Sequence, residues 1–168
     1  MGFGFLKDLI SILQGKKSPN ALAAGFALGA MLGLIPKGNL LGIVFFLLFF
    51  LTQVDKTAAF FAALIFTPLG YALDGLSHKL GYFLLVETQG LKLLWTTLYN
   101  APIVPWTKFN NTVVLGNLVL GLLLFLPLFF IVKKLAVLYD AHLKVKVNSW
   151  KITQAFKALD VWQKFKPN

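Results

Sequence analysis

Four small residues, Ala21, Gly25, Gly29 and Gly33, recur at every fourth position in the apolar run that ends at Pro36. Residues four apart lie on the same face of a helix. The segment therefore predicts a helix with one face almost free of side chains. Such a face lets a second backbone approach closely, which is how helices associate in lipid. We expect a membrane protein in which these four residues form a helix-packing face.

Two partners suit this face. One is the next apolar segment of the same chain, residues 40–54, which would pack on it as the second arm of a hairpin. The other is a second molecule, which would make the face an intermolecular interface. The intramolecular interpretation is preferred, and both stay open at the level of the sequence.

The composition places the chain in lipid and argues against nucleic acid. Hydrophobic residues make up 58% of the 168 positions and charged residues only 13%, against about 25% charged in a typical soluble domain. The net charge is +10, and every basic residue is lysine. Arginine, which binds phosphate groups bidentately, is absent. We expect the lysines to attract anionic lipid headgroups. Without cysteine, the chain forms no disulfide.

Both ends of the chain have apolar stripes at helical spacing with lysines between them, as in helices that lie on a membrane surface. The stripes are formed by Leu6, Leu9, Ile10 and Leu13 near the start, and by Ile152, Ala155, Phe156, Leu159 and Trp162 near the end. Lysines crowd both terminal segments, so the positive-inside rule predicts two cytoplasmic termini and an even number of membrane crossings.

Between the first two apolar helices, Pro36, Lys37, Gly38 and Asn39 predict a hairpin turn. Each helix, of about 15 to 17 residues, would be about 22 to 26 Å long. A hydrocarbon core is about 30 Å thick. The pair therefore forms either two thin spans or a re-entrant hairpin that enters and leaves on one side. Lys37 at the turn would contact a lipid phosphate or extend to the interface.

The third apolar segment, residues 57–86, carries a predicted kink and a candidate polar site. Pro68 removes one backbone donor, so the helix should bend after Thr67. Asp74 and His78 are four residues apart, with Lys79 adjacent. Ionisable groups at membrane depth indicate a proton relay or a headgroup contact. The simpler interpretation is a helix end that carries charge because water reaches it.

The expected architecture is all-α: a polytopic membrane protein with a glycine- and proline-rich hairpin, further broken transmembrane helices and amphipathic interfacial helices at both termini. Its expected parts are an interfacial helix (1–17), the hairpin and kinked third helix (18–86), an interfacial elbow (87–110), a transmembrane helix (111–134) and a basic amphipathic cytoplasmic tail (135–168). The elbow is less apolar and rich in aromatic residues, as in the aromatic belts at membrane interfaces.

The run SPNALAAGFALGAMLGLIPKGNLLGIVFFLLFF, followed by TPLGYALDGLSHKLG, resembles the bacterial membrane family known as domain of unknown function 2062. The resemblance covers about residues 18–85 and rests on Pro19, Gly25, Gly29, Gly33, Pro36, Gly38, Thr67 and Pro68. The family's usual Asn-Pro step is Thr67-Pro68 here. The stretch YNAPIVPWTKFNNTVVLG is similar to a gammaproteobacterial branch of the family. That resemblance implies a location in the inner membrane and a larger envelope protein, encoded nearby, as partner.

No catalytic motif stands out. The chain has no P-loop, no Gly-x-Ser-x-Gly and only six acidic residues, so we expect no enzyme and no cofactor. Asp74 and His78 give two ligands, fewer than a metal site needs. We expect a non-catalytic subunit that anchors or scaffolds a larger envelope protein, and we expect that protein to take part in lipid or glycan transport. The alternative is a small homo-oligomeric transporter or lipid-translocating protein. A polar cavity near Asp74, His78 and Thr67 would favour the alternative, and a packed interior the scaffold.

Overall fold

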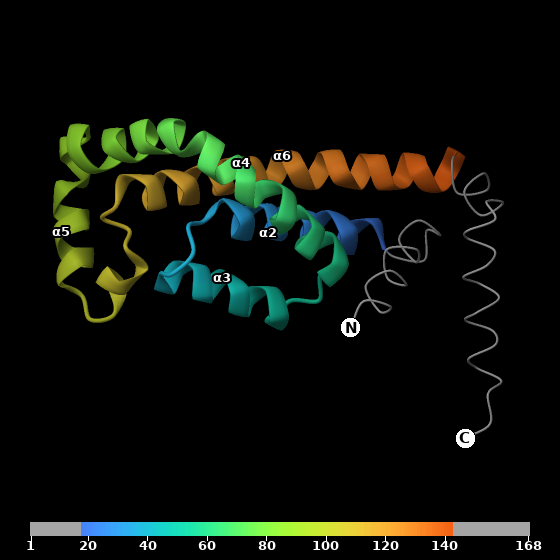
Figure 1. Ribbon diagram of the computed structural model, residues 1–168, viewed down its shortest axis with the longest axis horizontal. Coiled ribbons are helices and arrows are strands. Elements are labelled where there is room, and N and C mark those ends of the chain that lie inside the picture. Colours follow the sequence, from blue (N-terminus) through green and yellow to red (C-terminus); the bar gives the residue numbers. More distant parts are fainter. Residues whose placement is uncertain (1–17, 143–168) are drawn as a thin grey trace, which may run out of the picture.

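The computed structural model describes residues 18–142, and this part of the chain is all-helical, without strands (Figure 1). The α-helices are α2 (Pro19–Leu34), α3 (Leu40–Leu51), α4 (Lys56–Tyr82), α5 (Lys92–Asn100) and α6 (Thr112–His142). Short turns connect them: the π-helical η1 (Phe83–Glu87) and the 3₁₀ turns η2 (Gln89–Leu91) and η3 (Val104–Thr107). The expected all-α class is confirmed for these residues. The predicted helix at 1–17 and the tail after residue 142 lie outside them.

Three helices, α2, α4 and α6, pack against one another and form the core. Small residues dominate their contacts, because only small side chains allow three helix backbones to come together. The buried apolar side chains on α2 and α4 include Ala23, Ala27, Ala30, Ala58, Ala59 and Ala62. Leu34 and Met31 on α2 fill the remaining space.

Two of the described helices are long and apolar enough to cross a bilayer, Lys56–Glu87 and Thr112–Ala141. Their 32 and 30 residues correspond to about 45 to 48 Å of helix. The 16 residues of α2 and the 12 of α3 correspond to about 24 and 18 Å, less than the hydrocarbon thickness. The hairpin is therefore the short part of the molecule and the α4–α6 pair the long part.

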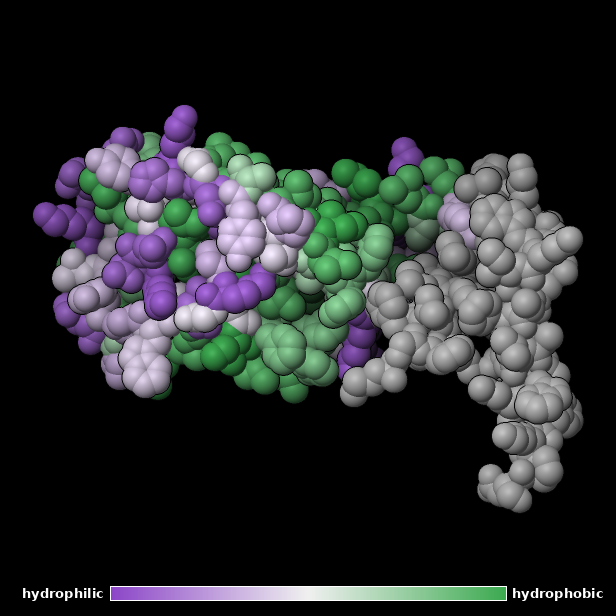
Figure 2. Space-filling model, in the orientation of Figure 1, coloured by the Kyte–Doolittle hydropathy of each residue, from purple (hydrophilic) through white to green (hydrophobic). Residues whose placement is uncertain are grey.

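The hairpin arm α3 has no buried residue. Its Phe46, Leu47, Phe50 and Leu51 are each at least half exposed. Figure 2 shows the same character over the middle of the molecule, where hydrophobic residues form a continuous surface, while hydrophilic residues gather at the end that carries α5. Exposed apolar patches of this extent are rare on soluble monomers.

Two helix boundaries differ from the sequence prediction. The second arm, expected over 40–54, ends at Leu51, and Asp55 then caps α4 by accepting a hydrogen bond from the Ala58 amide at 2.8 Å. The last helix, expected to end near residue 134, continues to His142. Charged residues mark where a helix leaves the apolar layer, but lysine is a good helix former. Lys133 and Lys134 therefore do not end the helix.

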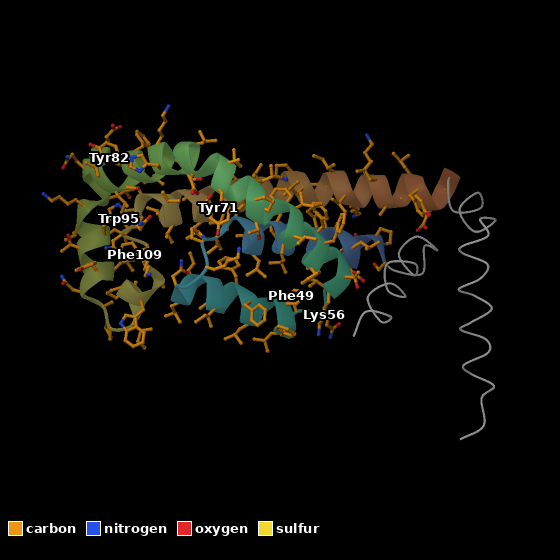
Figure 3. The ribbon with its side chains drawn as sticks, in the orientation of Figure 1. Phe49, Lys56, Tyr71, Tyr82, Trp95 and Phe109 are labelled. Carbon is orange, nitrogen blue, oxygen red and sulfur yellow. The ribbon has the colours of Figure 1, made fainter. Side chains whose placement is uncertain are left out.

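The segment between α4 and α6 turns the chain through α5, which lies at one end of the molecule (Figure 1). The Trp95 indole nitrogen donates to the backbone oxygen of Leu84 at 2.8 Å, and its ring lies 5.9 Å from that of Phe109. Figure 3 shows Trp95 of α5 and Phe109 of the segment before α6 side by side. These contacts fix the turn between the two long helices.

Candidate functional site

The four residues of the predicted packing face all lie on the side of α2 that meets the start and first half of α4. The Ala21 carbonyl accepts a hydrogen bond from the Asp55 amide at 3.0 Å. A Cβ added at Gly25 would collide with the Asp55 carbonyl, and one at Gly29 with the Ala59 backbone. At Gly33 it would lie 2.7 Å from the Phe66 Cβ. The two backbones therefore touch directly.

The partner of this face is α4 of the same chain, so the expectation that residues 40–54 cover it is wrong. The reason is the shape of the partner surface. The α3 segment presents Phe and Leu, whose side chains hold a neighbouring backbone away. The α4 segment and its cap residue instead present the backbone at Asp55, Ala59 and Ala63, and only the Cβ of Phe66. Two helices approach closely when both have small side chains at the contact.

A second close crossing, which the sequence reasoning missed, joins the far half of α4 to the start of α6. A Cβ at Gly81 would collide with the Thr112 backbone, and one at Gly116 with the Ser77 backbone. The signal in the sequence was the small residues Ser77 and Gly81 on α4, four apart, and Gly116 on α6, whereas Gly121 lies against Met31 of α2. Thus α4 uses one half against α2 and the other against α6.

The predicted turn at Pro36, Lys37, Gly38 and Asn39 connects α2 to α3. Gly38 adopts a φ of +85°, a left-handed conformation that glycine takes without a steric penalty. The Asn39 side chain caps α3, since its Oδ1 accepts from the Gly42 amide at 2.8 Å while its Nδ2 donates to the Pro36 carbonyl at 2.9 Å. The turn is built by the residues that the sequence singled out.

Lys37 folds back over the end of α2. Its Nζ donates to the carbonyls of Leu32, Gly33 and Ile35 at 2.8, 2.9 and 3.1 Å. These oxygens are among those that a helix end leaves without partners, and a cation there is favoured by the helix dipole. The same Nζ lies 3.5 Å from the Thr67 Oγ1 of α4.

Thr67 and Pro68 lie inside α4, which continues through the proline without a break. Figure 1 shows α4 changing direction between its two halves. The Thr67 hydroxyl donates to the Ala63 carbonyl at 2.7 Å, one helical turn earlier. Proline leaves a helix carbonyl without its usual donor. The Lys37 ammonium thus approaches α4 at the Thr67 hydroxyl, next to the proline.

A cavity of about 280 Å³ lies between the hairpin turn, α4 and the segment before α6. Its polar and charged lining residues are Lys37, Asn39, Thr67, Tyr71, Asp74, Lys108 and Asn111. Figure 3 shows Tyr71 on α4 close to the connection between α2 and α3. Three parts of the sequence more than 25 residues apart thus meet around one polar space.

Asp74 links this cavity to a buried polar pair. Ser77 and Asn117 are 0% and 1% exposed, and the Ser77 hydroxyl donates to Asn117 Oδ1 at 2.7 Å. The Asn117 amide donates to Asp74 Oδ1 at 3.4 Å. Buried polar groups are costly unless they are hydrogen-bonded, so the pair fixes the register between α4 and α6. The sequence reasoning had missed Ser77 and Asn117.

The three residues of the predicted polar site do not share one cavity. His78 Nδ1 lies 2.7 Å from the Thr112 Oγ1, and His78 and Lys79 line a separate cavity with Tyr82 and Glu87. Asp74 lines the cavity with Lys37 instead. Residues four apart on a helix differ in direction by about 40°. Asp74 accepts a hydrogen bond from Asn117 of α6, whereas His78 lies against Thr112 at the start of that helix. Within residues 18–142, no cluster of three or more His, Cys, Asp or Glu side chains could hold a metal.

Comparison with known proteins assigns the chain to a family. The model of an uncharacterized family conserved in bacteria, domain of unknown function 2062 (DUF2062), matches residues 5–144. The chain belongs to the DUF2062 family. The DUF2062 match extends the resemblance seen at residues 18–85 through α6, so the two close crossings both lie inside the family region. The gammaproteobacterial branch stays a prediction.

One relative is an uncharacterized protein of Treponema pallidum (strain Nichols). It is 26% identical over 143 residues, which cover 85% of this chain and 88% of the relative. No solved structure matches the chain. The DUF2062 family is uncharacterized, so membership assigns no activity to the chain.

Proposed function

We propose that the chain is a non-catalytic, multi-pass subunit of the bacterial inner membrane that anchors or scaffolds a larger envelope protein, one that handles lipid or glycan. The observation that supports this role is the contrast between the tightly packed core of α2, α4 and α6 and the exposed helix α3. Backbone contacts at Gly29 and Gly116 hold α2, α4 and α6 together, while α3 buries no residue.

The proposed topology has two full crossings, α4 and α6, and a re-entrant α2–α3 hairpin. The lengths of the helices support it, because α2 and α3 are each shorter than the hydrocarbon core. The start of α2 and the end of α6 lie toward the same end of the molecule (Figure 1). With the lysine-rich terminal segments, this favours two cytoplasmic termini.

The size of the cavity also favours a scaffold over a transporter. At about 280 Å³ it lies at the lower limit of small-molecule pockets, which run from about 300 to 1,000 Å³. The close contacts among α2, α4 and α6 leave no wide passage between these helices. A single copy would therefore hold a small group and not a whole lipid.

Crosslinking in native membranes tests the proposal. A photoreactive amino acid at Phe46 or Leu47 of α3 should form an adduct with one larger envelope protein, because these side chains point away from the core. The matched control is Ala27 of α2, which is fully buried and should give no intermolecular adduct. A chain that purifies as a solitary monomer in mild detergent and forms no adduct from α3 contradicts the proposal.

The second candidate is a small homo-oligomeric transporter or lipid-translocating protein. The lining of the cavity, as distinct from its size, favours it, because Lys37, Thr67 and Asp74 surround a polar space beside the proline-containing part of α4. Purified chain in liposomes distinguishes the two candidates. Movement of a labelled lipid across the bilayer by this protein alone supports translocation, and its absence leaves the scaffold as the better account.

A further inference from the structure

The cavity that Lys37, Asp74 and Lys108 line carries charges of both signs at separate positions. Asp74 comes from α4 and Lys108 from the segment before α6, while Lys37 comes from the hairpin turn. Asp74 forms an ion pair with neither lysine in the described part of the chain, and its carboxylate accepts one hydrogen bond there, from Asn117. The positive and negative side chains therefore remain available to a ligand that carries both an anionic and a cationic group.

Lys108 is the better hydrogen-bond donor of the two lysines. The three donors of Lys37 already meet backbone carbonyls at the end of α2 and of Ile35 just after it, although its positive charge still acts on the cavity. Lys108 is exposed, and within residues 18–142 no hydrogen bond or ion pair engages its ammonium. A phosphate next to Lys108 would thus gain a charge-assisted hydrogen bond without breaking another contact.

The backbone holds Lys108 in place for such a contact. Its φ is +56°, a left-handed conformation that is uncommon for residues other than glycine. Two hydrogen bonds fix it, one from its amide to the Pro105 carbonyl at 2.9 Å and one from the Asn111 amide to its carbonyl at 2.9 Å. Residues kept in sparsely populated conformations by their surroundings are concentrated at ligand sites.

We propose that this cavity binds a zwitterionic group that joins a phosphate to a primary ammonium, with the phosphate at Lys108 and Lys37 and the ammonium at Asp74. The phosphoethanolamine headgroup of a phospholipid has this chemistry, and so does a soluble phosphoamine. A headgroup of this size fits a space of about 280 Å³, whereas a complete lipid does not. The inference goes beyond the scaffold role and does not require it, since no partner protein takes part.

Binding to the purified full-length chain in detergent tests the proposal. The probes are short-chain phosphatidylethanolamine and phosphatidylglycerol, which share the phosphate and differ in the ammonium. The wild type should bind the first about tenfold more tightly. Asp74→Asn should abolish that preference by weakening the phosphatidylethanolamine complex about tenfold, and Lys108→Gln should weaken both complexes by about the same factor.

Two further arms make the result specific. Lys79→Gln is the matched control, because Lys79 is also exposed on the α4 side but lines the other cavity, and it should change neither affinity. Soluble glycerophosphoethanolamine distinguishes the sources: competition by it at equal concentration indicates a soluble ligand, and competition by the short-chain lipid alone indicates a membrane headgroup. Circular dichroism of each variant confirms its fold.

Two results would overturn the inference. One is a wild type that binds both lipids equally and keeps that ratio in Asp74→Asn. The other is a loss in Lys79→Gln as large as that in Lys108→Gln, which would indicate general attraction of lysines to phosphate. Neither result bears on adducts formed from α3, so failure here and failure of the scaffold proposal are separate outcomes.

Discussion

The two arms of the hairpin, α2 and α3, have opposite surroundings although they are neighbours in sequence. In α2 nine residues are buried, most of them glycine and alanine, whereas in α3 none is buried and phenylalanine and leucine dominate. The more apolar arm is therefore the more exposed one. Apolarity alone does not decide which helix forms the interior of this molecule.

Side-chain size explains the difference. In lipid, a phenylalanine gains little by moving from acyl chains into protein, because both surroundings are apolar. Close contact between backbones does gain dispersion energy, and helices with small residues achieve it. Gly25 and Gly29 thus mark the interior, and Phe46 and Leu51 mark the exposed apolar surface.

The largest effect should come from truncating a leucine on the buried arm. Leu34 of α2 is 2% exposed and Leu51 of α3 is 79% exposed. Leu34→Ala should lower the free energy of unfolding by about 2 to 5 kcal/mol, because it leaves a cavity among three helices. Leu51→Ala should change it by less than about 0.5 kcal/mol. Unfolding by SDS titration from mild detergent measures both; equal losses would contradict the comparison.

A smaller effect should follow from adding one methyl group to a glycine. Gly29→Ala places a Cβ against the Ala59 backbone and should cost about 1 to 3 kcal/mol, since two helices must move apart. Gly75→Ala is the matched control: no atom lies within 4 Å of its added Cβ, and alanine favours the helix by up to about 1 kcal/mol. The same titration should give opposite signs, and a neutral Gly29→Ala would show that the helices do not touch there.

The smallest of these effects should come from the buried polar pair. Ser77→Ala leaves Asn117 Oδ1 without its donor and should cost about 1 to 2 kcal/mol. Thr96→Ala on α5 removes only an exposed hydroxyl bonded within its own helix, and should be neutral within about 0.5 kcal/mol. If Ser77→Ala is equally neutral, the pair does not fix the register of α4 and α6.

The fold class and the packing face could be predicted because they depend on local pattern. Spacing of four puts Gly25, Gly29 and Gly33 on one face whatever the rest of the chain does. Their partner could not be predicted in the same way. A row of glycines does not indicate which helix will pack on it. In α4, moreover, the small residues are scattered among phenylalanines such as Phe60 and Phe66.

The cavity was only half predictable for a related reason. Thr67 and Asp74 both belong to α4, and residues seven apart lie on the same face of a helix. Lys108 comes from the segment whose sequence predicts an aromatic interfacial elbow. It lines the cavity because the chain returns from α5 to the start of α6. His78 was grouped with Asp74 by spacing, yet its contact is Thr112, a residue 34 positions away.

The central claim is that lipid is the solvent of the large apolar residues while small residues form the interior, and spin-label accessibility tests it most directly. Because the chain has no cysteine, single cysteines can be introduced at Leu47, Leu126 and Ala27 and labelled in liposomes. The account predicts that Leu47 and Leu126 labels are relaxed strongly by oxygen and weakly by a water-soluble nickel complex, and that the Ala27 label is shielded from both. Strong relaxation of the Leu47 and Leu126 labels by the nickel complex would place these helices in water and contradict the account.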